Sequence, residues 1–438
     1  MTLRTLALAF LFCLAPAVAQ AAGWTNVVLL YADDLGWGDV GFNGRTSWTT
    51  PNLDKLASQG TVFKRWYTAG VVCAPSRGAM LTGKYTIHSG VSRNNDDLPA
   101  AETTLAEALK ARGYATALFG KWHHGAPRDG AKTYTHPMDQ GFDEFFGFTN
   151  AGHAWQKFPK ELWDGRALKP VAGHSDDLFA DHAIEFIGRN KARPFFLYVP
   201  FINSHFNIEA PADEIALHKG KFIEKDPEQP LNATYAAMVT RLDKNVGRVL
   251  AALDANHLGE STLVIFTSDH GATFEKGNLG TSNFHDSNGP FRGQKRTLWE
   301  GGIRVPAVVR WPGQVPAGKV STEVIHMTDV FPTVFAATVE ARPEPSWKVD
   351  GTSVLEAWRG KSPVPERTLF WEWRSEGIDQ LAAMRGRWKY VITNGGKGEL
   401  FNVVADPAER RNVVAESPKV GQGLEVELRA WLATERKD

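Results

Sequence analysis

Cysteine is scarce, charge of neither sign is in excess, and long apolar runs are rare in this 438-residue chain. Of the two cysteines, Cys13 lies in an apolar N-terminal stretch, so Cys73 alone remains in the body of the protein. A single cysteine excludes an internal disulfide. Lysine plus arginine equals aspartate plus glutamate at 49 each, which excludes recognition of nucleic acid or a membrane surface through bulk charge. The chain contains no internal repeat and no low-complexity segment.

The N-terminus holds the one pronounced apolar run, residues 6–14, which Arg4 precedes and small residues follow. This order is typical of a secretory signal peptide with an Ala-x-Ala cleavage site. The run is well short of the roughly 20 residues that a membrane span needs. Phe12 is too bulky for the position before a lipidated cysteine. We therefore predict a signal peptide over residues 1–21 and a periplasmic or secreted protein that has no membrane attachment after cleavage.

Four short apolar runs are each followed by polar residues. They are residues 26–31, 115–119, 194–199 and 262–266, and the polar residues that follow include Asp33-Asp34, Lys121-Trp122-His123, His205 and Asp269-His270. Continuous apolar runs of this length indicate parallel strands that are covered on both faces. Because ligands of such sheets bind beyond the carboxyl ends of the strands, the four polar clusters are expected at one rim.

Helical periodicity lies between these runs, most clearly over residues 235–253. Alternation of strands and helices predicts an α/β fold, with a large central, mostly parallel sheet flanked by helices, over residues 22–345. Residues 346–438 are expected to form a linker and a smaller C-terminal subdomain, in which an antiparallel sheet is closed by a helix.

The segment Cys73-Ala-Pro-Ser-Arg77 combines a nucleophile with a permanent cation. Pro75 suits the first turn of a helix, which would place Cys73 at a helix N-terminus, where backbone N–H groups favour negative charge. Arg77, four residues on, shares that helix face. The combination suits a sulfate or phosphate substrate, whereas a lone cysteine is more often a small buried apolar residue.

Asp33 and Asp34 place two carboxylates side by side after the first strand. Adjacent carboxylates repel each other unless a cation neutralises them. An isolated Asp-Asp is often a solvated turn, but a second acidic strand end at Asp269 favours a metal site. Oxygen ligands favour Ca²⁺ or Mg²⁺.

These motifs, in this order, resemble the type I sulfatases of the alkaline phosphatase superfamily. The resemblance covers nearly the whole mature chain and includes Cys73-x-Pro75-Ser76-Arg77 with Leu81-Thr82-Gly83, Ala32-Asp33-Asp34-Leu35-Gly36, Gly120-Lys121-Trp122-His123, Gly141-Phe142-Asp143, Asp269-His270-Gly271 and Glu399-Leu400-Phe401-Asn402. Single matches of this length occur by chance, whereas a full set in family order does not.

The resemblance implies hydrolysis of sulfate esters, with Cys73 converted to formylglycine by a formylglycine-generating enzyme. The substrate would be a sulfated small molecule or glycan. One hydroxyl of the hydrated aldehyde would attack sulfur, and the other would later expel the sulfate, which divides one difficult step into two. The implied catalytic residues are Cys73, Arg77, Lys121, His123, His205 and Lys295, and the implied calcium ligands are Asp33, Asp34, Asp269, His270 and an oxygen on modified Cys73.

The resemblance also assigns roles to these side chains. Arg77, Lys121 and Lys295 would stabilise the sulfuryl oxygens. His123 would act on the hydrated aldehyde, and His205 would protonate the leaving oxygen.

Several alternatives stay open at this point. Many family members have Asn where this chain has His270, so Mn²⁺ or Zn²⁺ is an alternative metal. A phosphate or phosphonate monoester hydrolase would share fold, metal and modified cysteine, and an inactive exported glycan-binding relative is a further alternative. Among the other histidines, His124 is expected to be a supporting residue, and His136, His153 and His174 are expected to be substrate-loop or surface residues.

Overall fold

A computed structural model describes residues 24–125, 135–375 and 377–435. The predicted signal peptide, residues 1–21, lies outside the described residues. Within the described part of the chain, no helix combines the length and the apolar character needed to cross a membrane.

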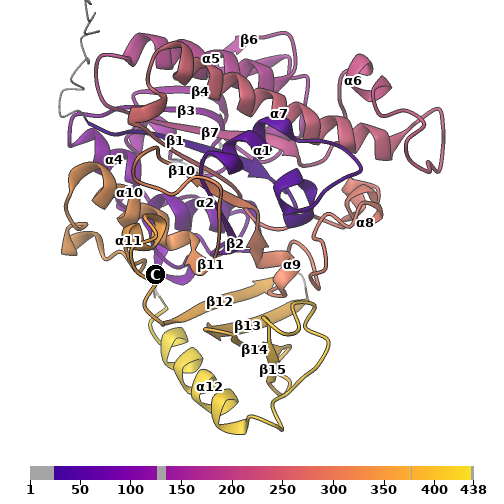
Figure 1. Ribbon diagram of the computed structural model, residues 1–438, viewed down its shortest axis with the longest axis vertical. Coiled ribbons are helices and arrows are strands. Elements are labelled where there is room, and N and C mark those ends of the chain that lie inside the picture. The colour runs from indigo at the N-terminus through magenta and orange to yellow at the C-terminus, as the bar shows by residue number, and fades with distance from the viewer. Residues whose placement is uncertain (1–23, 126–134, 376, 436–438) are drawn as a thin grey trace, which may run out of the picture.

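An eleven-stranded sheet forms the centre of the larger part of the molecule (Figure 1). Its strand order is β11-β2-β10-β8-β1-β7-β3-β4-β5-β6, and β9 pairs with β2. The central strands β8, β1, β7, β3 and β4 run parallel, while β10 enters antiparallel between β2 and β8. The bounds are β1 Asn26–Asp33, β2 Thr61–Tyr67, β3 Ala115–Lys121, β4 Glu144–Phe148, β5 Glu161–Asp164, β6 Ala167–Pro170, β7 Phe195–Ser204, β8 Thr262–Ser268, β9 Arg304–Val305, β10 Ala307–Arg310 and β11 Lys319–His326.

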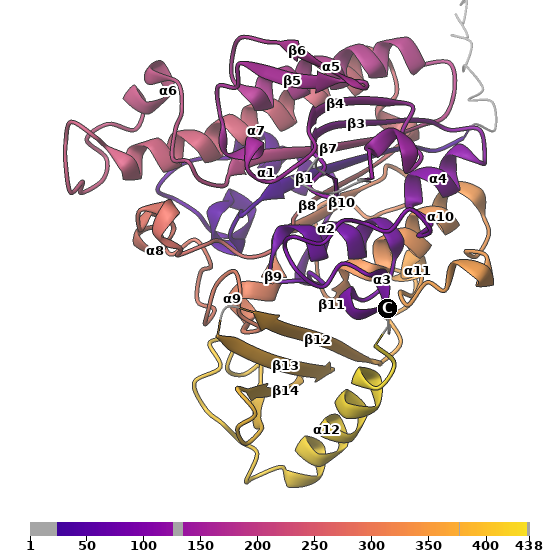
Figure 2. The same ribbon diagram turned by 180° about the vertical axis from the view of Figure 1, so that it is seen from behind.

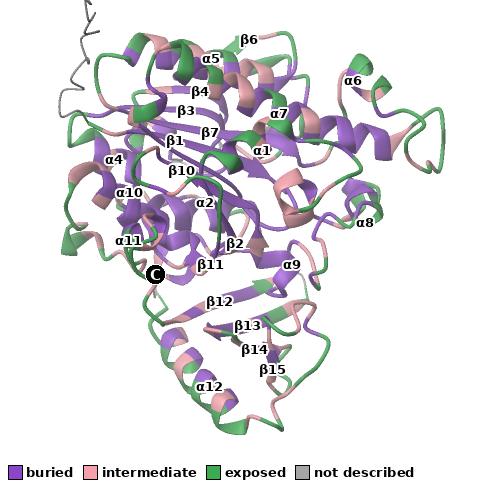
Figure 3. Cartoon of the chain, in the orientation of Figure 1, coloured by how far each residue is buried: buried purple, intermediate pink, exposed green. Residues whose placement is uncertain are grey.

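Helices cover both faces of this sheet, as its continuous apolar strands require (Figures 1 and 2). Alternate residues of β1 point to opposite faces, so Val28 and Leu30 pack in one core and Val27 and Leu29 in the other. Several of the covering helices carry exposed residues on their outward sides (Figure 3). The first face carries α1 Pro51–Ser58, α5 Ser175–Asn190 and α7 Leu231–Ala255, and the second carries α2 Cys73–Thr82, α4 Leu105–Lys110, α10 Val330–Val339 and α11 Leu355–Trp358.

Four short helices lie in the connections around this core. They are α3 Thr86–Ser89, α6 Ala212–Ala216, α8 Thr281–Phe284 and α9 Glu300–Ile303. The helix α9 lies between the main sheet and the smaller C-terminal part, which makes it a junction of the two (Figures 1 and 2).

The C-terminal part is an antiparallel sheet in the order β12-β13-β14-β15, with one helix against it. The bounds are β12 Thr368–Ser375, β13 Ile378–Arg385, β14 Trp388–Thr393, β15 Glu399–Asn402 and α12 Pro418–Leu432. One sheet face packs on α12 and the other on Tyr67, Val72 and Ile303 of the main domain. The chain before β12 still belongs to the main core, where Trp358 of α11 stacks on Trp66 at 6.1 Å.

The predicted fold class is confirmed, and each of the four predicted strand runs is a strand of the main sheet. The periodic segment 235–253 lies within α7. Strand β7 continues to Ser204 and so delivers His205 directly to the carboxyl end of the sheet.

A buried charged cluster joins the two parts. The Nζ atom of Lys389, on β14, lies 3.1 Å from a carboxylate oxygen of Glu300 on α9 and 2.9 Å from one of Glu409. All three side chains are buried. Burial raises the pKa of Glu409 to about 7, against the lowering effect of Lys389. The Lys389 ammonium offsets both carboxylates, and Arg304 Nη1 adds a second cation 3.3 Å from Glu300 Oε2.

Replacement of Lys389 by Met should therefore destabilise the protein strongly. Loss of one partner of a buried ion cluster typically costs about 3–5 kcal/mol, because uncompensated charge stays behind. Urea denaturation would measure the change in the free energy of unfolding. The matched control is Lys169→Met, which removes the solvent-exposed pair with Asp164 and should cost about 0–1 kcal/mol. Equal, small losses for both variants would contradict the proposed importance of the cluster.

Candidate active site

Cys73 is the first residue of α2, and Val72 is its N-cap in an extended conformation. The thiol is almost completely buried, at 1% exposure. Arg77 follows one helical turn later, and its Nη1 donates to the carbonyl of Lys121 at 3.0 Å. Burial and Asp33 act to raise the pKa of the Cys73 thiol, but Lys121, Lys295 and His270 outweigh them and lower it. The helix N-terminus predicted from Pro75 is present.

Three carboxylates reach this point from the ends of two neighbouring strands. Asp33 is the last residue of β1, and Asp269 follows the last residue of β8. The two strands are in parallel register, with Ala32 opposite Ser268, so their ends lie at the same level. Asp34 turns away with a left-handed φ of 61°, and its backbone N–H donates to Asp269 Oδ1 at 3.1 Å. The register of β1 with β8 and the turn at Asp34 together bring the three carboxylate side chains close to one another.

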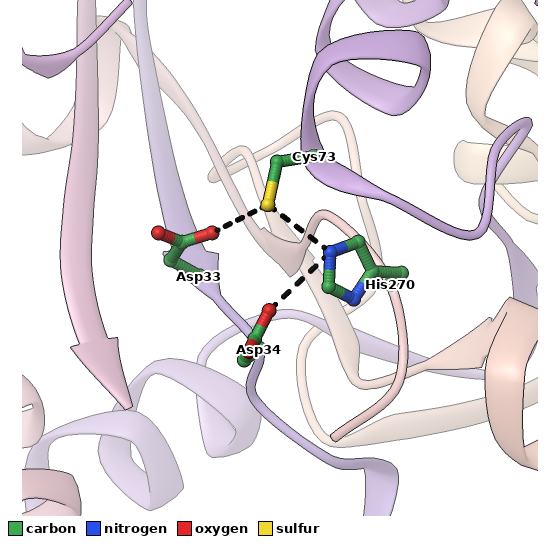
Figure 4. A group of neighbouring side chains, drawn as sticks. All are labelled: Asp33, Asp34, Cys73 and His270. Atoms are coloured by element: carbon green, nitrogen blue, oxygen red, sulfur yellow. Dashed lines mark hydrogen bonds and ion pairs between the residues drawn. The ribbon is translucent and has the colours of Figure 1, made fainter. Parts of the chain in front are cut away.

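Asp33, Asp34, Cys73 and His270 form a group that could hold a metal ion, with ligand atoms all within 4.8 Å of one another (Figure 4). The Cys73 Sγ atom lies 3.4 Å from Asp33 Oδ1 and 3.4 Å from His270 Nε2. The Nε2 atom is also 3.3 Å from Asp34 Oδ1 and 3.5 Å from Asp269 Oδ1. All five predicted metal-site residues are thus brought together.

The orientation of His270 suits a ligand. Its Nδ1 lies 2.9 Å from the carbonyl oxygen of Gly271, which only accepts hydrogen bonds, so Nδ1 carries the proton. In the neutral imidazole, Nε2 then directs a lone pair at the carboxylates. Burial lowers the pKa of His270, but Asp269, Cys73 and Asp34 together raise it to about 9. A strong negative potential therefore acts at the centre of the group, where a metal ion would bind.

Three cations surround the carboxylates and pair with them. Lys121 Nζ lies 2.6 Å from Asp33 Oδ2, and Lys295 Nζ lies 2.9 Å from Asp34 Oδ1. Arg77 Nη2 bridges Asp269 Oδ2 at 3.0 Å and Asp33 Oδ1 at 3.2 Å. Three negative and three positive side chains cancel formally. A bound divalent cation would leave this set with a net charge of +2, which suits an anionic substrate.

The ion pairs set the protonation of two of the carboxylates. Burial acts to raise the pKa of Asp33, but Lys121, His205 and Arg77 hold it well below its usual range. Burial likewise opposes ionisation of Asp34, yet Lys295 and the two histidines lower its pKa to about 2. The pKa of Asp269 is raised by burial and by its acidic neighbours. Asp33 and Asp34 are therefore the firmly ionised members of the group.

His123, His205 and Arg77 retain capacity for further hydrogen bonds. Both ring nitrogens of His123 and the Nε of Arg77 are buried without a hydrogen-bond partner among the described residues. His205 lies with Nδ1 2.5 Å from the Phe206 carbonyl and Nε2 3.8 Å from Asp34 Oδ2. Burial lowers the pKa of both imidazoles, that of His205 to about 3. Both shifts favour the neutral form of the ring.

Three further histidines make contacts outside this charged group. His124 is fully buried and packs edge-on against Trp122 at 5.1 Å. His136 and His174 each accept the backbone N–H of the residue two positions on, at 3.2 Å, and so cap helix starts. The side chain of His153 is outside the described set.

Supporting residues were missed by sequence reasoning. Glu275 lies 3.5 Å from Lys295 and 2.7 Å from Arg296, and so holds Lys295 from a second side. The Oδ1 of Asn94 accepts the N–H of Ala74 at the start of α2. Neither residue lies in a recognisable motif, and only the folded chain brings them to the site.

Comparison with known proteins places this site in a family. The family model for sulfatases matches residues 25–340. A second model, described as N-sulphoglucosamine sulphohydrolase, C-terminal, matches residues 291–438. The chain therefore belongs to the sulfatase family.

Curated relatives agree with this assignment. Arylsulfatase G of Rattus norvegicus is 34% identical over 90% of this chain and 83% of its own length. Steryl-sulfatase of Mus musculus is 33% identical over 90% of this chain and 79% of its own length. N-acetylgalactosamine-6-sulfatase of Canis lupus familiaris is 32% identical over 83% of this chain and 71% of its own length. The protein is a sulfatase enzyme that hydrolyses sulfate esters.

Solved structures share the fold over almost the whole chain. The structure of Ps i-CgsB in complex with k-i-k-neocarrahexaose matches with a TM-score of 0.85 at 29% identity, over 94% of each chain. The phosphonate monoester hydrolase of Agrobacterium radiobacter matches with a TM-score of 0.68 at 21% identity, over 94% of this chain and 96% of its own. The latter similarity concerns the fold alone.

Proposed function

We propose that this sulfatase cleaves sulfated carbohydrates, with Cys73 converted to formylglycine and one calcium ion bound beside it. The observation that carries the proposal is the position of Cys73. Its Sγ lies at a helix N-terminus and touches both a carboxylate and an imidazole of the candidate metal group. A structural cysteine would instead be expected to pack among apolar groups.

The environment of residue 73 supports a hydroxyl-bearing side chain at this position. Formylglycine, when hydrated, supplies two hydroxyls on one carbon, and the calcium ion supplies a Lewis acid that favours ionisation of one of them. The residues that would hold the ion are Asp33, Asp34, Asp269 and His270, together with an oxygen on residue 73. Hard carboxylate oxygens favour calcium, and the imidazole of His270 is the single softer ligand.

The cations of the chain would bind and orient the sulfate. A lysine ammonium has three donors and a guanidinium five, so Lys121, Lys295 and Arg77 keep donors beyond those directed at carboxylates. Fixed donors around developing charge lower the barrier without reorganisation. The unpartnered, neutral His123 is suited to hold the proton of the hydroxyl at residue 73.

His205 is proposed to protonate the leaving oxygen. Its Nδ1 contacts the Phe206 carbonyl, so Nε2 is the atom that faces the site. In the structure as it stands, this imidazole is neutral. The anionic oxygens of a bound sulfate ester would raise its pKa, because a nearby opposite charge favours the protonated form.

The names of relatives support a carbohydrate substrate. They include an N-acetylgalactosamine-6-sulfatase and the C-terminal model of an N-sulphoglucosamine sulphohydrolase, and the Ps i-CgsB structure holds a neocarrahexaose. We further propose a periplasmic or secreted location and maturation by a formylglycine-generating enzyme. Both rest on the sequence, through the predicted signal peptide and the Cys73-x-Pro75-Ser76-Arg77 motif.

Active protein should carry formylglycine at residue 73. Mass spectrometry of the peptide that ends at Arg77 would show the loss of mass expected when a thiol becomes an aldehyde. Cys73→Ala should abolish turnover but leave the thermal unfolding midpoint nearly unchanged, because little buried volume is lost. Full activity in a sample whose thiol is intact would disprove the proposed nucleophile.

Removal of the metal should abolish activity, and calcium should restore it best. Asp34→Asn should weaken calcium binding by about 100-fold or more, since it removes a charged ligand and alterations even beyond the direct ligands typically cost 10–100-fold. Isothermal titration calorimetry gives this readout without turnover. The matched control is Asp243→Asn, a buried carboxylate that binds Asn52 and Leu53 instead.

Two other results would change the metal assignment. Better restoration by Mn²⁺ or Zn²⁺ would assign the site to a softer ion and implicate His270. Full activity after exhaustive chelation would rule out the metal site.

Loss of His205 should matter most when the leaving group is poor. Wild-type enzyme and His205→Ala should be compared on N-acetylgalactosamine 6-sulfate, glucosamine 6-sulfate, p-nitrophenyl sulfate and p-nitrophenyl phosphate. A general acid typically contributes about 10²–10⁴-fold, so kcat on the sugar sulfates should fall by that factor and kcat on the nitrophenyl ester far less. Equal losses would refute the acid role. Faster wild-type turnover of the phosphate would favour the phosphomonoesterase alternative.

A further inference from the structure

One loop beside the active site shows its side chains in an unusual arrangement. Trp155 is 43% exposed and Phe158 is 47% exposed, although large aromatic residues are normally buried. Between them, Lys157 is completely buried, and its Nζ donates to the carbonyl of Ile202 at 2.8 Å. Burial lowers the pKa of Lys157 to about 8, against the raising effect of Asp176. The loop is thus anchored through its lysine and presents its aromatic rings to solvent.

Trp155 belongs to the wall of the catalytic centre. Its carbonyl accepts the N–H of Asn207, and its ring lies 5.4 Å from that of Phe206. The Phe206 ring in turn lies 4.2 Å from the His205 ring, and Lys295 Nζ lies 5.9 Å from its centroid. Trp155, Phe206 and His205 therefore form a continuous series of ring contacts.

Phe206 is fixed from behind. A Cβ atom at Gly277 would lie 3.1 Å from Phe206 Cδ2, so the absence of a side chain there allows the close contact. The aromatic rings are therefore held in place by two contacts: Phe206 packs against Gly277, and the buried Lys157 fixes the loop that carries Trp155. A rigid aromatic surface loses little conformational entropy when a ligand binds to it.

Polar groups lie near the same surface. Arg296 Nε and Glu275 Oε1 are paired at 2.7 Å, with side chains 22% and 25% exposed, and Glu275 also reaches Lys295. A ligand whose sulfate meets Lys295 and His205 therefore finds an aromatic wall and a partly exposed ion pair close by. The apolar ring system of a steroid would offer this ion pair no hydrogen-bonding groups. A sugar ring offers an apolar C–H face to the aromatic rings and hydroxyl groups to the ion pair.

We propose that Trp155, backed by Phe206, is the platform on which the sugar ring that bears the sulfate stacks. This proposal rests on the carbohydrate substrate proposed above and specifies how it is recognised. Lys157 is a positioning residue for this platform. As a residue that stacks on the sugar ring, Trp155 would affect sugar binding separately from sulfate binding.

The test compares Trp155→Ala and Trp155→Phe with wild type on the sulfated sugar of the above panel that wild type cleaves fastest. We expect the KM of the alanine variant to rise about tenfold, as loss of an aromatic stacking partner implies, with kcat little changed. The phenylalanine variant should recover most of the affinity. The inhibition constant of inorganic sulfate should stay at the wild-type value in both variants.

The matched control is Trp24→Ala. Trp24 is 47% exposed but precedes the start of β1, so about eight residues of strand, roughly 26 Å, separate it from the site. An unchanged KM in Trp155→Ala overturns the platform, and a parallel rise in the sulfate inhibition constant overturns it in favour of a structural role. If wild type cleaves aryl sulfate but none of the sugar sulfates, the carbohydrate substrate fails and the platform with it.

Discussion

The convergence of three carboxylates with three cations is the constraint on which the rest of the site depends. Asp33, Asp34 and Asp269 come together because β1 and β8 are in parallel register and end at the same level. So many buried acidic groups would be prohibitive without compensation, since the effective cost of burying each charge is several kcal/mol. Lys121, Lys295 and Arg77 supply that compensation, and each comes from a different segment of the chain. Correct folding of distant segments is thus a condition for a stable site.

The C-terminal subdomain takes part in this condition. It contacts the segment that carries Lys295, because the backbone N–H of Leu298 donates to Gln380 and that of Glu300 donates to Glu409. Trp371 of β12 also donates to the carbonyl of Thr68, whose hydroxyl in turn donates to the Asp269 carbonyl. The small sheet therefore holds two parts of the catalytic centre, although it supplies none of the proposed catalytic residues.

The sequence predicted the central strands and the candidate site residues because both leave local signals. Continuous apolar runs such as residues 26–31 identify a doubly covered strand, and the polar residues after them lie at its carboxyl end. Strand β2 gave no comparable signal, since Lys64 and Arg65 interrupt its apolar residues. The exposed strand β6 and the antiparallel entry of β10 are likewise decided by tertiary contacts.

Supporting residues escaped prediction for the same physical reason. Lys157 looks like an ordinary surface lysine, and only its bond to the Ile202 carbonyl reveals that it points inward. Glu275 and Gln380 act through Lys295 and Leu298, which lie 20 and 82 residues away from them, respectively.

The burial of α2 places a condition on any modification of Cys73. Every residue of this helix is buried, and Cys73 itself is 1% exposed. Local opening would have to separate Arg77 from Asp33 and Asp269, and so would leave buried charges uncompensated. The charged cluster therefore opposes exposure of Cys73 in the folded chain.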